Sequence, residues 1–409
     1  MPRGLTLGLL PCLLLAAAAD AMETHGAIVV APEYVSVDRS SPYYVEPPTV
    51  EIPRRSSRND IELRAQEGGF NAQGILRQQV AEGSRPEYHG VANQFYYDGQ
   101  FTPGLGWTAG KKVLSWGVGF GFKPLDVIQR EDRRSINAPP LVGVPLLAIE
   151  RLTDTDALTV VWTHPGQGRD TTDSGDPSLA LHWYRLAGSD DYHGVARVSR
   201  RRSLEAGLGA THVIGDEWSI YAAALYQRHG WQHANTLIGS GETLAASDPM
   251  VDTRRGGGAK AVAGTQWTGE SGWSTLLEAW YDADAWRRAD WQALDALTAQ
   301  QRALAGLAPQ TAIDGNVAWS SQAFLGTDLL RENVLLRIAY DDRDGFKPYA
   351  DVLVTPSDHG RVLTLGAVWE GNRQRLSLGA RQFGGAAGSA YAQAPIRRIF
   401  WAEWRLAIF

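Results

Sequence analysis

The densest group of charged side chains in this 409-residue chain follows a glycine-rich stretch that begins near residue 110. The segment runs from Gly110-Lys111-Lys112 through Trp116-Gly117 to Pro124, and seven charged residues lie between positions 123 and 134. They are Lys123, Asp126, Arg130, Glu131, Asp132, Arg133 and Arg134. Charged side chains of this kind on a glycine- and proline-rich bend do not indicate catalysis. At a narrow passage, their electric field would select among ions and polar solutes. Four of the seven are basic, so the segment predicts a positive field that three acids temper.

No arrangement of residues predicts catalysis, a metal site or a bound cofactor. The nine histidines lack the HExxH motif and the paired spacings of metal ligands. His229, near Asp216, and His359, next to Asp358, have no serine that the sequence can place within reach. The glycines near residue 119 are not followed by the lysine and hydroxyl residue of a phosphate-binding loop. We therefore expect no enzyme, no cofactor and no nucleic-acid partner, and a barrel enzyme acting on lipid or peptide is the weakest alternative.

Other ionisable side chains recur on one face of segments that alternate apolar and polar residues. Asn333–Asp341, Arg361–Trp369 and Arg375–Arg381 each place their large apolar residues two positions apart, which is the period of a β-strand. The charged residues that this alternation assigns to the polar face include Arg197, Lys260, Glu278, Arg337, Arg375 and Arg381. A strand with one apolar and one charged face fits a sheet that separates lipid from a water-filled lumen.

The C-terminal segment Arg398–Phe409 alternates in the same way and ends on an aromatic residue. A sheet in hydrocarbon cannot leave an edge unpaired, so such a last strand must pair with the first. Tight polar turns such as Gly215-Asp216 alternate with long segments such as His229–Gly257. With Pro348–Val354 counted as loop, this parity predicts about 16 strands, within a range of about 14–18. The fold prediction is an all-β, transmembrane antiparallel barrel over residues 59–409, with short periplasmic turns and long outer loops, one of which contains a helix within Ala285–Leu307.

The N-terminus predicts export. Arg3, the apolar stretch Leu5–Ala19 and the small residues up to Ala21 form a signal peptide over residues 1–21, which contains the only cysteine, Cys12. Residues 22–58 carry five prolines and show no periodicity, so we predict an irregular periplasmic leader there. An exported barrel is expected in the cell outer membrane.

The passage Gly110–Pro124 resembles a Gly-Lys…Trp-Gly…Pro passage of the alginate-export and related porin-like outer-membrane families. The resemblance covers this motif and the general architecture. It implies a barrel in which one loop, here Trp116–Val144, folds into the lumen as a constriction, and it places the seven charged residues named above at that constriction.

These patterns favour an outer-membrane channel for small polar, and by the modest basic excess anionic, solutes. The alternative is an outer-membrane component of a polysaccharide-export or surface-assembly system, in which the leader docks a partner. Arg200, Arg201 and Arg202 lie at a predicted outer connection, where guanidinium groups can bind lipopolysaccharide phosphates bidentately. The barrel-assembly machinery is the partner expected for the C-terminal strand. A homo-oligomer is compatible with the sequence.

Overall fold

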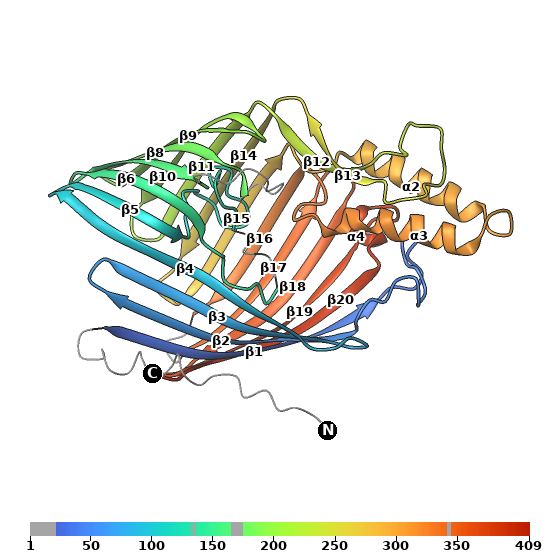
Figure 1. Cartoon of the computed structure of the whole chain (residues 1–409), viewed down its shortest axis with the longest axis horizontal. Helices are drawn as coiled ribbons and strands as arrows, with labels where there is room; N and C mark the ends of the chain where they lie inside the picture. The colour runs from blue at the N-terminus through green and yellow to red at the C-terminus, as the bar shows by residue number, and fades with distance from the viewer. Residues whose placement is uncertain (1–21, 132–133, 135, 165–174, 342–344) are drawn as a thin grey trace, which may run out of the picture.

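Eighteen antiparallel strands form one closed barrel in the computed structural model of this chain, which describes residues 22–131, 134, 136–164, 175–341 and 345–409 (Figure 1). Each strand pairs with its sequence neighbours in the barrel, and the first strand closes the ring by pairing with the last. The predicted fold class is confirmed, with a strand number at the upper limit of the predicted range. The predicted signal peptide, Asp132 and Arg133 lie outside the described residues.

The barrel strands are β1 (Glu23–Val37), β2 (Arg55–Glu67), β3 (Phe70–Ala81), β4 (Glu87–Thr102), β5 (Leu105–Lys112), β6 (Val144–Leu152), β7 (Asp156–Thr163), β8 (Ser178–Ala187), β9 (Asp190–Ser199), β10 (Ser203–Ile214), β11 (Trp218–Gln227), β14 (Gly258–Thr268), β15 (Trp273–Asp282), β16 (Glu332–Tyr340), β17 (Phe346–Thr355), β18 (Gly360–Glu370), β19 (Gln374–Gly385) and β20 (Ile396–Ala407). The connections outside the wall contain the hairpin β12 (Gly230–Asn235) with β13 (Met250–Arg255), the helices α2 (Arg288–Ala303), α3 (Gln310–Ser320) and α4 (Ala390–Gln393), and the 3-10 helix η3 (Ser321–Leu325). Within the described residues, none of the helices has the length and apolar character needed to cross a membrane.

The two-residue alternation of the sequence becomes the two faces of the wall. On β11, Ile220 and Tyr226 are 44% and 54% exposed, whereas Leu225 between them is buried. The same contrast recurs on β18, where Leu365 is 52% exposed and Val362 is buried. Large apolar side chains left exposed around a whole barrel are stable only against lipid, while the residues between them line the lumen.

The two ends of the barrel differ. At one end, here called the turn end, short connections join the strands, and the chain reaches Phe409, whose carbonyl accepts a hydrogen bond from the Gly26 amide (3.2 Å). At the other end, here called the loop end, lie the long connections and all the helices (Figure 1). The helix predicted within Ala285–Leu307 is confirmed as α2.

Two predictions about strands were wrong, and both involve proline. Residues 22–58 are not an irregular leader, because they contain β1, the connection after it and the start of β2. Pro348–Val354 is not loop, because it lies in β17. The prediction therefore missed β1 and β17 as strands of the barrel.

The ladder explains how the wall accommodates these prolines. Proline has no amide hydrogen, so it cannot donate a ladder bond to a neighbouring strand. The pairing between β1 and β20 runs to Val30 and resumes at Glu33, so Pro32 is paired with β2 alone. Pro348 pairs with Ala367 on β18 and has no partner on β16. Each proline therefore occupies a position where one side of the ladder is already interrupted.

Candidate functional site

The described residues of the connection between β5 and β6, 113–131, 134 and 136–143, leave the wall and lie inside the barrel, as the resemblance implies for Trp116–Val144; we call them the inner loop. Its central residues Leu125, Val127 and Ile128 are buried by packing against the inner face of the wall. Gly119 has φ +110, a conformation that only glycine adopts without strain, and it lies directly before the residues that Glu278 binds.

Glu278 on β15 fixes the inner loop. Its carboxylate is fully buried and accepts backbone N–H bonds from Phe120 (2.7 Å), Gly121 (2.8 Å) and Phe122 (3.0 Å). The Tyr221 hydroxyl on β11 donates a fourth bond at 2.5 Å. A carboxylate with four donors is well satisfied despite burial, and bonds to a charged acceptor are stronger than neutral ones. The loop is thus held by a wall residue that sequence alternation had assigned to the lumen.

Arg197 on β9 makes a second attachment. Its guanidinium is 1% exposed and donates to the Val127 carbonyl (2.6 Å) of the inner loop. The same group pairs with Glu205 on β10 at 3.0 Å, and it lies 3.8 Å from Asp176. Buried charges of this kind are stable only when paired, so the three groups and the loop backbone form one interdependent unit.

A third group of buried charges surrounds Asp284, just beyond β15 at the loop end. Its carboxylate pairs with Lys260 (2.6 Å) and Arg202 (2.8 Å), and Arg130 of the inner loop lies 3.9 Å away. Burial alone would raise the pKa of Asp284, but the three cations outweigh it and hold the pKa well below its usual range. Arg202 is 3% exposed, so the prediction that it contacts lipopolysaccharide is wrong.

Replacing Asp284 with asparagine is expected to destabilise the barrel by about 3–5 kcal/mol, because the buried Arg202 would lose this carboxylate partner and the buried Lys260 would keep only Asp282. Urea unfolding of vesicle-inserted protein at neutral pH measures this. The depressed pKa means that the contribution is present at neutral pH and is lost as the pH falls through that depressed value, so the variant should lose less stability in acid. Asp252→Asn, at an exposed carboxylate on β13, is the control. Equal stability of the Asp284 variant and the parent would contradict this reading.

Inside the inner loop, two of the predicted charges hold the loop together. Asp126 is buried and accepts the amides of Trp116 (2.6 Å) and Gly117 (2.7 Å). Lys123 is also buried and pairs with Glu131 at 2.7 Å. These side chains maintain the bend and present little free charge to a passing ion.

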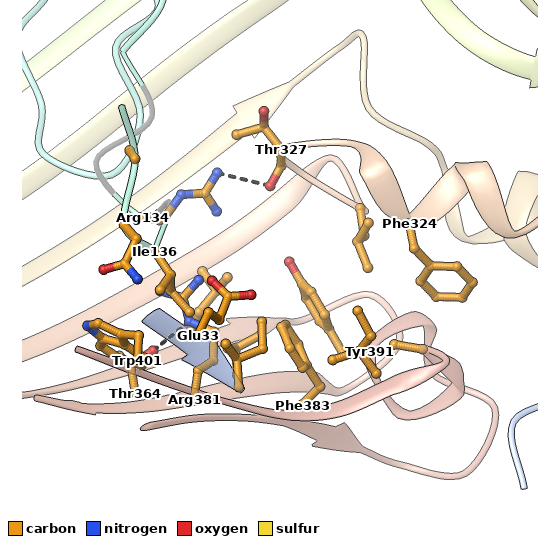
Figure 2. A pocket seen from close by; sticks show the side chains of 18 of the residues that line it. Glu33, Arg134, Ile136, Phe324, Thr327, Thr364, Arg381, Phe383, Tyr391 and Trp401 are labelled. Carbon is orange, nitrogen blue, oxygen red and sulfur yellow. Dashed lines mark hydrogen bonds between the residues drawn. The ribbon is translucent and has the colours of Figure 1, made fainter. Parts of the chain in front are cut away.

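Arg134 joins the inner loop to the long connection between β15 and β16. Its guanidinium donates to the Thr327 carbonyl at 3.1 Å (Figure 2). It also pairs with Asp328 (2.9 Å) and lies over the Trp280 ring at 4.9 Å. Trp280 Nε1 donates to the same Asp328 carboxylate (3.1 Å). The inner loop is therefore tied at this point to a segment of the loop end.

The inner loop also reaches the pairing between β1 and β20, here called the closure seam. The Asn137 side-chain amide lies 3.5 Å from the carbonyls of both Pro32 and Ala402, where the ladder is interrupted. Arg58 on β2 donates to the Asn137 carbonyl and pairs with Glu403 at 3.1 Å. Contacts on β9, β15 and the closure seam thus span the lumen from one side to the other.

A cavity of about 780 Å³ remains between the inner loop and the wall formed by β16–β20 and β1; we call it the wall cavity. Arg337 pairs with Asp351 (3.0 Å) and lies over the rings of Tyr349 (4.1 Å) and Phe120 (5.1 Å). Arg381 donates to the Thr364 hydroxyl at 3.0 Å, and Figure 2 shows it beside Glu33. The charged residues of the lining are Arg134, Arg337, Arg375, Arg381, Glu33, Asp351 and Glu403.

The loop end covers this cavity on the outer side. Tyr43, in the connection after β1, donates to Asp295 on α2 at 2.6 Å, and its ring lies 5.0 Å from that of Phe324 in η3. Both aromatic residues line the wall cavity, and Trp291 and Leu294 of α2 are buried behind them. The cavity therefore has a charged wall and an apolar outer rim.

The six lumen residues predicted from alternation separate into two groups. Arg337, Arg375 and Arg381 line the wall cavity. Arg197, Lys260 and Glu278 are on the same face of the wall but are buried, so they hold structure in place. Sequence reasoning missed Asp284, Glu33, Asp351 and Arg58. Of these, Glu33 and Asp351 alternate with apolar residues on β1 and β17, so the signal was present in segments predicted not to be strands.

One comparison with known proteins, that with solved structures, bears on the fold. No family model and no curated protein matches the chain. The solved structure of OccK5 (OpdH) from Pseudomonas aeruginosa aligns with a TM-score of 0.53 at 9% identity, over 95% of this chain and 99% of that one. A variant of the Rhodopseudomonas blastica porin aligns at a TM-score of 0.43 and 13% identity, over 95% of this chain and 100% of that chain. The OccK5 likeness shows a shared barrel fold, and the resemblance to the alginate-export family stays a prediction.

Proposed function

We propose that this chain is an outer-membrane channel in which the inner loop narrows the lumen, and through which small polar solutes pass with a preference for anions. The observation that carries the proposal is the wall cavity, which lies beside a loop held at several points. A barrel of this size would otherwise enclose a wide aqueous lumen. The attachments at Glu278, Arg197 and the closure seam support the cavity beside the loop as the space for transport.

The anion preference rests on the charges of the lining. Four arginines face three carboxylates in the wall cavity, a net charge of +1 if all are ionised. A positive field in a low-dielectric passage concentrates anions and repels cations. Because Arg337 and Arg375 are themselves paired with acids, the preference is expected to be weak.

The export alternative loses the feature on which it depended. It required residues 22–58 as a periplasmic leader that docks a partner, but these residues form β1 and its connection at the loop end. A channel needs no such segment.

Planar-bilayer recording of purified, folded protein tests the proposal. We expect discrete current steps and, across a salt gradient, a reversal potential that favours the anion. Folding is verified beforehand by the difference in gel mobility before and after boiling in detergent. A silent bilayer with protein that passes this check would overturn the proposal.

A further inference from the structure

Four arginines at the loop end of β9–β14 have no acidic partner among the described residues. Arg200 follows β9, Arg228 follows β11, and Arg254 with Arg255 ends β13, and all four are exposed. We call Arg200, Arg228, Arg254 and Arg255 the rim arginines. Exposed guanidinium groups that lack an internal counter-ion are available to an external anion.

The register of the hairpin β12–β13 brings these residues into one sector. Gly230 pairs with Arg255 and Trp231 with Arg254, and Arg228 lies two residues before Gly230. The β9–β10 turn joins them through Arg201, whose carbonyl accepts the Trp231 ring N–H at 2.9 Å. The Arg201 guanidinium lies over the Trp231 ring at 4.1 Å and pairs with Asp252 at 2.6 Å. Trp231 and Arg254 therefore share one face of the hairpin, Arg255 lies on the opposite face, and Asp252 is occupied by Arg201.

This sector lies where the apolar belt of the barrel ends. The Arg228 amide donates to the Leu204 carbonyl at 2.8 Å, directly after the last pairs of β10 with β11. Leu204 is 44% exposed, Tyr226 54% and Val198 58%, and all three point away from the lumen. The first polar residues above such a belt meet the headgroups of the surrounding lipid.

We propose that the rim arginines bind the phosphate groups of lipopolysaccharide in the outer leaflet. Arginine presents a planar fork of donors that matches phosphate bidentately. Of the three arginines predicted from the sequence to contact lipopolysaccharide, only Arg200 belongs to this site. Arg202 is buried and pairs with Asp284, and Arg201 contacts Asp252 and Trp231. The proposal rests on the outer-membrane location in the proposed function, but it does not require transport.

The test compares two triple variants that remove equal charge. Arg228→Gln, Arg254→Gln and Arg255→Gln remove three of the four rim arginines. Arg151→Gln, Arg185→Gln and Arg373→Gln remove three exposed arginines at the turn end. Each protein is incubated with lipopolysaccharide, with enzymatically dephosphorylated lipopolysaccharide and with inorganic phosphate, and the bound lipid or phosphate per barrel is measured.

We expect the rim variant to bind lipopolysaccharide at least about tenfold more weakly than the parent, a difference of about 1.4 kcal/mol. The turn-end variant should bind like the parent, and dephosphorylated lipopolysaccharide should bind poorly to all three. Undiminished binding by the rim variant, an equal loss in the turn-end variant, or inorganic phosphate binding as tightly as lipopolysaccharide would each overturn the proposal. Bilayer conductance of the rim variant should match the parent, so a failure here is distinguishable from a failure of the channel proposal.

Discussion

Glu278→Ala is expected to raise the single-channel conductance several-fold, because it removes the acceptor that holds the inner loop against β15. The amides of Phe120, Gly121 and Phe122 all donate to this carboxylate. Leaving a buried donor unsatisfied costs about 1–3 kcal/mol per group, so the attached position of the loop loses most of its advantage over positions exposed to water. The wall strands keep their ladders, and the barrel should therefore still fold. Planar-bilayer recording measures the conductance.

Two further variants make this result interpretable. Glu278→Gln retains one acceptor oxygen and should give a smaller increase in conductance. Asp216→Ala removes an exposed carboxylate from the turn between β10 and β11 at the turn end, and should leave conductance unchanged. Limited trypsin digestion gives an independent readout, because a released loop exposes Arg130 and Arg134 to cleavage. Unchanged conductance and unchanged digestion in the folded alanine variant would show that Glu278 does not position the loop.

The sequence predicted the architecture well because the barrel imposes a strict local period. Alternation on segments such as Arg361–Trp369 reflects lipid on one side and water on the other, and every strand repeats this signal. The alternation is weaker in the two missed strands: Ala27–Ala31 of β1 is apolar on both faces, and Pro32 and Pro348 argued against a strand. Only the register shows that each proline lies beside an interruption in the ladder, and register is a long-range property that no local window contains.

The candidate site was predicted less completely, for a different reason. Alternation correctly assigns Lys260 and Arg337 to the same face of the wall, and it cannot distinguish their roles. Lys260 is fully buried with Asp282 and Asp284, whereas Arg337 lines the wall cavity. Which lumen residues meet solute depends on where the inner loop lies, and that depends on contacts between residues more than a hundred positions apart, such as Glu278 with Gly121.

The arginines of the wall cavity should set its ion selectivity. Replacing both Arg337 and Arg381 with glutamine leaves two arginines and three carboxylates in the lining, so its net charge changes from +1 to −1. Asp351 would lose its partner and, as an unpaired carboxylate, would attract cations. We therefore expect the reversal potential across a salt gradient to change sign, from weakly anion-selective to cation-selective. The shift should shrink near 1 M salt, where the Debye length falls to about 3 Å.

A matched variant separates the local field from the charge of the whole protein. Arg361→Gln with Arg398→Gln removes two arginines from the outward face of β18 and β20, and it changes the net charge by the same amount. Its reversal potential should equal that of the parent, because the substituted groups lie outside the lumen. If the outward pair shifts selectivity as much as the cavity pair, the effect comes from overall charge. If neither pair shifts it, ions do not pass between the inner loop and β16–β20, and the transport path must lie elsewhere in the barrel.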